Sequence, residues 1–176
     1  MRPAAEPYHG AMPELQHTQQ DAAVVEAQLG RPLRGRWAVA RRCHLGVPMV
    51  IENHPRLEDS SPFPTLFWLT CPILVKRVSR QESSGALPAL GERLSKDPDL
   101  RERFYAALSR YRARRDEHEV IEDSGSPPGG GPDKVKCLHA HVAHQLAGGR
   151  NPVGALTLSR SDFPDCIAPC YEATDA

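Results

Sequence analysis

Short runs of hydrophobic residues dominate the chain between residues 36 and 71. The runs "RWAVARRC" and "VPMVIEN" are typical of strands and are joined by His-Leu-Gly at positions 44–46, which favours a β-hairpin. The compact apolar run "LFWLTC" ends before Pro72 and predicts a buried strand, which we expect at the centre of the sheet. The pattern therefore predicts a small antiparallel sheet from residues 36–71.

Helical spacing replaces this pattern in the second half of the chain. Apolar residues there recur every three or four positions, at Leu100, Phe104, Leu108 and Tyr111. Asp97 followed by Pro98 is typical of a helix start, so we predict one long helix from Asp97 to His118. A shorter helix is predicted over "DAAVVEAQLGR", with Asp21 as its N-cap. Strands followed by helices indicate an α+β fold, in which several helices pack against the small sheet.

The same periodicity predicts which side chains form the core. The expected core residues are Trp37, Val39, Val50, Phe67, Trp68, Leu69, Leu100, Phe104, Leu108, Leu138 and Val142. Both ends of the chain lack such a pattern, which predicts a disordered tail over residues 1–19 and an irregular, mobile tail over residues 161–176. We therefore predict a single α+β domain over residues 20–160, with a Gly- and Pro-rich loop at residues 123–132.

Charge and composition exclude several classes of protein. The chain has 22 basic and 22 acidic residues, and this balance gives no strong signal for nucleic-acid binding. No run reaches the roughly 18 apolar residues of a membrane span, and the N-terminus lacks the apolar core of a signal peptide. We therefore expect a cytoplasmic protein with reduced cysteines and with a small molecule or another protein as its partner.

The candidate chemistry is concentrated in "KVKCLHAHVAHQL", residues 134–146, which carries one cysteine and three histidines. A helix would place Cys137, His141 and His144 on one face beside an apolar stripe, with His139 pointing elsewhere. An extended segment would instead place Cys137, His139 and His141 on one face. Either arrangement joins a thiol to two imidazoles, which suits zinc. The simpler alternative is a buried helix whose cysteine and histidines pack in the core without metal.

Three ligands from one segment do not complete a structural zinc site, so a fourth must come from elsewhere. Cys71 is the best candidate, because it ends the predicted strand on which this segment should pack, and we expect the two to meet. Cys43 and the Cys166/Cys170 pair are weaker candidates. The predicted metal ligands are Cys71, Cys137, His139 and His141.

Two other kinds of site are open. Glycines just before the segment and lysines at its start predict an anion-binding helix N-terminus. The simpler interpretation of this stretch is a flexible linker. The predicted anion-binding residues are Gly130, Gly131, Lys134 and Lys136. Cys137 or Cys71 beside a histidine would form a thiolate–imidazolium pair for nucleophilic catalysis.

Four stretches of the chain together resemble a known family: "QLGRPLRG", "RCHLGVP", "PFPTLFWLTCP" and "VKCLHAHVAHQLAGGRNPVG". They are similar to domain-of-unknown-function family 501 of actinobacteria and some other bacteria, over about residues 21–154. The motif residues that the resemblance carries over are Cys71, Pro72, Lys136, Cys137, His139, His141, Asn151 and Gly154. The family has no established activity. Its genes commonly neighbour those of a septum-formation initiator, an enolase and an exopolyphosphatase, which implies a bacterial housekeeping setting and lends weak support to a phosphate-containing ligand.

Two functions are compatible with these residues. The first is a small enzyme or ligand-binding protein with a Cys/His site, which binds zinc or acts on a phosphate-containing ligand. The second is a non-catalytic interaction module linked to cell division or the envelope. A pocket lined by the cysteine and histidine side chains would favour the first function. An exposed apolar patch, together with buried cysteines and histidines that pack on one another, would favour the second.

Overall fold

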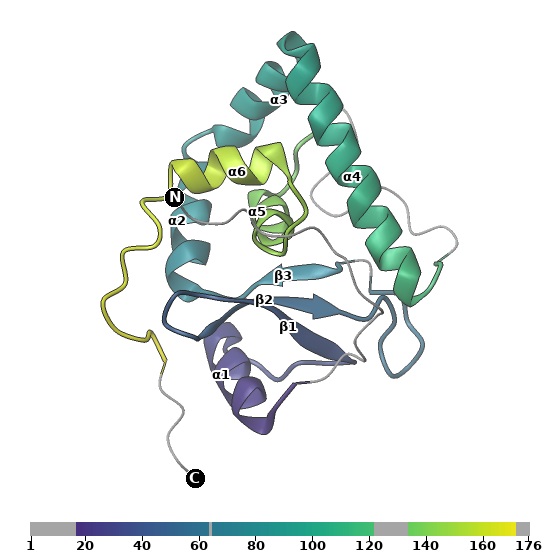
Figure 1. Cartoon of the computed structure of the whole chain (residues 1–176), viewed down its shortest axis with the longest axis vertical. Helices are drawn as coiled ribbons and strands as arrows, with labels where there is room; N and C mark the ends of the chain where they lie inside the picture. Colours follow the sequence, from purple (N-terminus) through teal and green to yellow (C-terminus); the bar gives the residue numbers. More distant parts are fainter. Residues whose placement is uncertain (1–16, 64, 122–133, 172–176) are drawn as a thin grey trace.

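The computed structural model describes residues 17–63, 65–121 and 134–171, which form six helices around a three-stranded antiparallel sheet (Figure 1). The predicted α+β fold is therefore confirmed. The loop predicted at residues 123–132, most of the predicted N-terminal tail and the last five residues lie outside this description. The limits of the single domain over residues 20–160 stay a prediction.

The sheet contains β1 (Trp37–Arg42), β2 (Pro48–Asn53) and β3 (Phe67–Leu69), in the order β1-β2-β3. The predicted hairpin is confirmed, with Val39 opposite Ile51 across β1 and β2. The expectation that "LFWLTC" supplies the central strand is wrong, because β3 is an edge strand and β2 lies between the other two. An apolar run indicates that the faces of a strand are covered, and here packed helices provide that cover although β3 has a strand neighbour on one side only.

One face of the sheet is covered by α1 (Gln19–Leu29), which lies below the strands in Figure 1. Thr18 is its N-cap, and Asp21 completes a capping box from the third helical position. The predicted N-cap was therefore placed three residues late, and residues 17–19 belong with the helix rather than with a tail. The helix packs on Trp37 and Ile51 to form a small second core.

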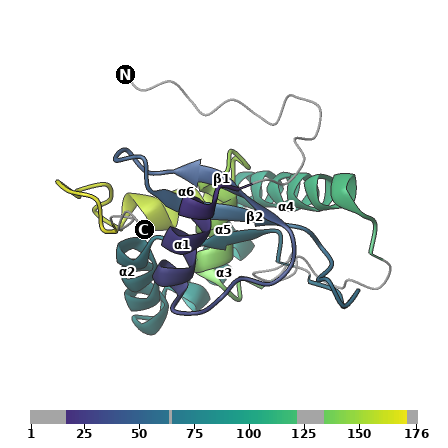
Figure 2. The same cartoon turned by 90° about the horizontal axis from the view of Figure 1, so that it is seen from below.

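The other five helices lie on the opposite side of the sheet (Figures 1 and 2). They are α2 (Pro72–Ser83), α3 (Ala86–Lys96), α4 (Pro98–His118), α5 (Leu138–Leu146) and α6 (Pro152–Ser159). The long helix is confirmed as α4, with Asp97 as its N-cap. No helix in the described ranges is long and apolar enough to span a membrane.

The predicted core is largely confirmed, since all its members except Val39 and Trp68 are buried. Those two are partly exposed because they lie on the face that the short helix α1 covers only in part. The C-terminal segment from Ser161 to Tyr171 has no helix or strand, as predicted. It is nevertheless attached to the domain, because Arg77 donates a hydrogen bond to the carbonyl oxygen of Ser161 at 2.9 Å.

Candidate functional site

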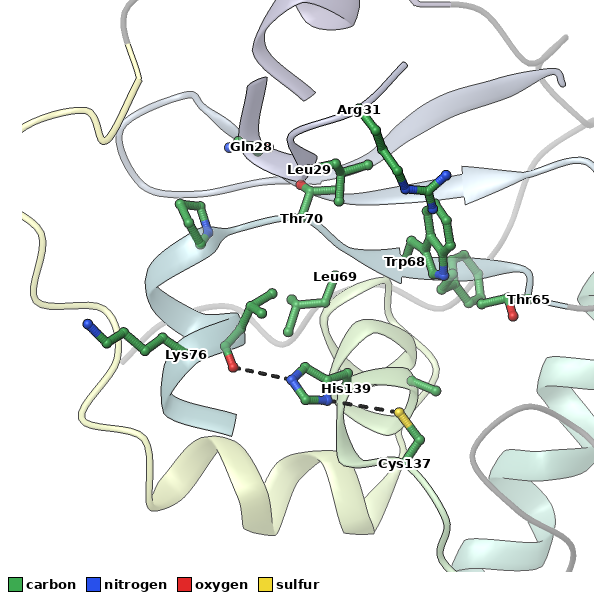
Figure 3. A pocket seen from close by; sticks show the side chains of 14 residues that line it. Gln28, Leu29, Arg31, Thr65, Trp68, Leu69, Thr70, Lys76, Cys137 and His139 are labelled. Carbon is green, nitrogen blue, oxygen red and sulfur yellow. Dashed lines mark hydrogen bonds between the residues drawn. The ribbon is translucent and has the colours of Figure 1, made fainter. Parts of the chain in front are cut away.

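A pocket of about 700 Å³ lies at the β3 edge of the sheet (Figure 3). Its wall comes from the end of α1, from β3, from the first two turns of α2 and from the start of α5. Half of the lining side chains are apolar, and Cys137 and His139 supply the thiol and the imidazole of the wall. The edge position of β3 therefore leaves the space that a further strand would fill.

The local conformation of residues 134–137 brings the thiol and the imidazole together. These residues have no regular secondary structure, and α5 begins at Leu138 with Cys137, whose backbone is extended, as its N-cap. Cys137 Sγ lies 3.9 Å from His139 Nδ1. Both sequence alternatives are thus partly right, because the segment starts extended and continues as a helix. Residues two positions apart on a helix point about 200° apart, so His141 faces away from His139.

The contacts of His139 identify which of its ring nitrogens faces the thiol. Nε2 lies 3.2 Å from the carbonyl oxygen of Val75 and 3.1 Å from Ser79 Oγ. A carbonyl oxygen only accepts hydrogen bonds, so Nε2 carries a proton. In the neutral ring Nδ1 is then the acceptor, and it faces Cys137.

Glu82 is the third member of the cluster, and the sequence patterns did not indicate it. It lies near the end of α2, and its Oε1 accepts the backbone N–H of Leu138 at 2.6 Å. The same oxygen lies 3.3 Å from His139 Nδ1. The carboxylate thus sits at the positive N-terminus of α5, where negative charge is favourable.

The electrostatics of the cluster favour a thiolate and an imidazolium. The Cys137 contact raises the pKa of His139; burial opposes this, and the charge of Glu82 adds to it. Burial tends to raise the pKa of the Cys137 thiol, but the His139 contact and the Ala140 backbone amide outweigh burial, so this pKa is lowered. A cysteine beside a histidine at a helix N-terminus is the arrangement that activates thiols.

The cluster also has the composition of a metal site. Glu82, Cys137 and His139 each present one ligand atom, and these atoms lie within 4.8 Å of one another. Among the His, Cys, Asp and Glu side chains of the described residues, these three form the group whose ligand atoms lie close enough together to hold one ion. Neither Cys71 nor His141, which the sequence placed in the metal site, belongs to it.

Cys71 lies at the N-cap of α2 and is buried in the main hydrophobic core. Burial raises the pKa of its thiol, and the nearby Cys170 and Cys166 thiols act in the same direction. It does not line the described wall of the pocket. The prediction that Cys71 shares a site with Cys137 stays a prediction, and this arrangement gives it no support.

His141 and His144 lie in a buried corner between α5 and α6, where Asn151 joins them. The Asn151 Nδ2 amide lies 3.1 Å from His141 Nδ1 and 3.3 Å from His144 Nδ1. Its Oδ1 accepts the N–H of Gly154 at 3.0 Å, which caps α6 and leaves the amide nitrogen to donate to both rings. Burial lowers the pKa of His144 to about 3, so this ring is neutral at pH 7.

Two glycines allow this corner to close. A Cβ at Gly154 would lie 2.2 Å from the carbonyl oxygen of His141, and a Cβ at Gly149 would lie 1.9 Å from His144 Cδ2. The "GGRNPVG" stretch is therefore accounted for by helix packing. Asn151, predicted as a motif residue of the site, has a structural role here.

Only part of the predicted anion site lies among the described residues. Gly130 and Gly131 lie outside the described residues. Lys134 and Lys136 are exposed, and neither lines the described pocket. Anion binding by this segment stays a prediction.

Comparison with known proteins places the chain in a family. Neither the curated proteins nor the solved structures include a match to it. A family model described as "Protein of unknown function (DUF501)" matches residues 39–159, which include all three residues of the Glu82–Cys137–His139 cluster. This match covers more than half of the chain and confirms the resemblance seen in the sequence motifs. The chain therefore belongs to the DUF501 family of proteins of unknown function.

Proposed function

We propose that the protein binds a small molecule in the pocket at the β3 edge and uses Cys137 as a nucleophile. The observation that carries this proposal is the 3.9 Å contact between Cys137 Sγ and His139 Nδ1 in the wall of the pocket. Structural cysteines are inert when their surroundings are apolar, whereas this one has a base beside it and a helix N-terminus behind it. A pocket lined by these side chains favours an enzyme or ligand-binding protein over a non-catalytic interaction module.

The proposed step follows from the hydrogen bonds of His139. The thiol proton of Cys137 passes to Nδ1 of His139. The Nε2 atom keeps its own proton and donates a hydrogen bond to the carbonyl oxygen of Val75. The carboxylate of Glu82, 3.3 Å from Nδ1, stabilises the imidazolium that forms. The thiolate then forms a bond to an electrophilic carbon of the ligand, and the leaving group departs with the proton from Nδ1. Water releases the product from sulfur and restores the thiol.

Zinc binding is the second candidate, because three different ligand atoms lie within 4.8 Å of one another. A thiolate, an imidazole nitrogen and a carboxylate oxygen are all zinc ligands, and three protein ligands leave a position open. The second nitrogen of His139 contacts a backbone carbonyl, as is usual for histidines that bind metal. Such an ion would make Cys137 a ligand in place of a nucleophile.

Alkylation of metal-free protein by iodoacetamide tests the nucleophile. Trypsin cleavage after Lys136 and Arg150 releases residues 137–150, in which Cys137 is the sole cysteine, so its rate can be followed by mass spectrometry. The rate at Cys137 should rise at a lower pH than the rate at Cys71, whose pKa is shifted the opposite way. His139→Gln should move the Cys137 profile to higher pH. Superimposable profiles for the wild type and this variant would exclude His139 as the base.

Metal analysis separates the two candidates. Protein purified without a His tag should contain close to one equivalent of zinc if the cluster is a metal site, and Cys137→Ser should lose it. Less than about a tenth of an equivalent in the wild type would reject the zinc candidate.

All five cysteines are free, which supports the cytoplasmic location that thiol chemistry favours.

A further inference from the structure

We infer that the pocket takes an anionic ligand: a carboxylate or phosphate attached to a flat apolar body. This inference rests on the proposal that the pocket is the ligand site, but it does not depend on which chemistry Cys137 performs. Three observations on the pocket wall support it.

The charge of the wall is positive. The described lining includes Arg31 and Lys76 and contains no aspartate or glutamate. Neither cation pairs with a carboxylate in the part of the chain that the structure describes. Two unpaired cations beside apolar walls raise the local concentration of anions and strengthen their binding.

Arg31 is held in a position suited to a planar anion. Its guanidinium carbon lies 4.7 Å from the centre of the Trp68 ring, in a cation–π contact. Stacking reduces the freedom of the guanidinium, and the N–H groups along its edge have no acceptor among the described residues. A guanidinium presented in this way binds a carboxylate or phosphate through two parallel hydrogen bonds.

The remaining wall fits an apolar body. Figure 3 shows Arg31 and Trp68 on one side of the pocket and Cys137 and His139 on the other, with Leu69 between them. A ligand with its anionic group at Arg31 and its flat body along Leu69 would direct its far end toward Cys137. The volume of about 700 Å³ lies within the range of small-molecule sites.

Three probes with one aromatic body test the inference: 2-naphthyl phosphate, 2-naphthoate and the neutral 2-naphthol. Their affinities are measured by isothermal titration calorimetry with the full chain. We expect at least one of the two anions to bind ten-fold or more tightly than 2-naphthol, and the stronger anion identifies the preferred group. Arg31→Ala should remove this preference by weakening the binding of the anions, whereas the exposed Arg112→Ala should change nothing.

Any of three results would overturn the inference. The three probes could bind with equal affinity, none of them could bind, or the preference for anions could survive both Arg31→Ala and Lys76→Ala. Cys137→Ala distinguishes it from the proposed function. If this variant keeps the preference for anions while wild-type Cys137 shows no dependence on His139, the ligand class stands and the nucleophile proposal fails.

Discussion

The Nε2 atom of His139 lies 3.2 Å from the carbonyl oxygen of Val75, and this contact determines that Nδ1 faces Cys137. The ring belongs to α5, but its orientation is imposed by α2. Glu82, at the other end of α2, reaches the same ring and the N-terminus of α5. The packing of these two helices, which contact each other along the pocket, therefore builds the whole cluster.

Glu82→Gln should lower the pKa of both partners in metal-free protein. The negative charge of Glu82 raises the pKa of His139, and it also raises the pKa of the Cys137 thiol. Glutamine keeps the oxygen that accepts the Leu138 N–H, so α5 retains its cap. NMR titration of the His139 ring and alkylation of Cys137 against pH measure the two shifts. The exposed Glu92→Gln is the control, and an unchanged His139 titration in Glu82→Gln would contradict the prediction.

Gly154→Ala should destabilise the fold by roughly 1–3 kcal/mol, which is typical of overpacking. The new Cβ would lie 2.2 Å from the carbonyl oxygen of His141, a backbone atom that cannot move without shifting α5. Gly91→Ala is a matched control, because Gly91 lies within α3 and a Cβ there meets nothing within 4 Å. That substitution should stabilise the protein by about 0.5–1 kcal/mol, since alanine favours helix. Urea unfolding of both variants checks the opposite signs.

The sequence predicts the hairpin, α1 and α4 well because local signals act within each of them. Asp97 and Pro98 mark the start of α4, and apolar spacing carries it to His118. The place of β3 at the edge was missed because apolar content shows that a strand is covered without showing what covers it. The N-cap of α1 was missed because Thr18 precedes the apolar pattern that the prediction relied on.

The site was predicted in part for similar reasons. Cys137 and His139 are close in sequence, so their pairing required only the right local conformation. Glu82 reaches them through the packing of α2 on α5, and no spacing rule could have indicated it. The direction of the His141 side chain depends on the exact residue at which α5 begins. Helix boundaries are the least certain part of a sequence-based prediction, and His141 was therefore assigned to the site with the wrong placement relative to His139.

Asn151→Ala should destabilise the corner between α5 and α6 in two ways. Loss of the N-cap of α6 costs about 0.5–2 kcal/mol, and each buried imidazole nitrogen left without a donor costs about 1–3 kcal/mol. Asn151→Ser keeps a capping oxygen but has no amide to reach His141 and His144, so its stability should lie between those of the wild type and the alanine variant. Equal losses in the two variants, measured by urea unfolding, would show that the amide contacts contribute little.

Acid should destabilise the protein through Glu52, a buried carboxylate of β2 that faces α4. Its Oε1 lies 2.7 Å from Arg114 Nε and 2.8 Å from His118 Nε2. Burial tends to raise the pKa of Glu52, but its His118 and Arg114 partners outweigh burial, so this pKa is lowered. The stability that Glu52 contributes is therefore present above its unfolded pKa of about 4.3 and is lost as the pH falls through the lower folded pKa.

Glu52→Gln should reduce the free energy of unfolding at pH 7 by roughly 3–5 kcal/mol and should flatten its decline below about pH 5. Urea unfolding at a series of pH values measures both effects, with the exposed Glu102→Gln as the control. If the variant and the wild type lose stability with the same slope between about pH 5 and pH 3, another group is responsible for the acid sensitivity.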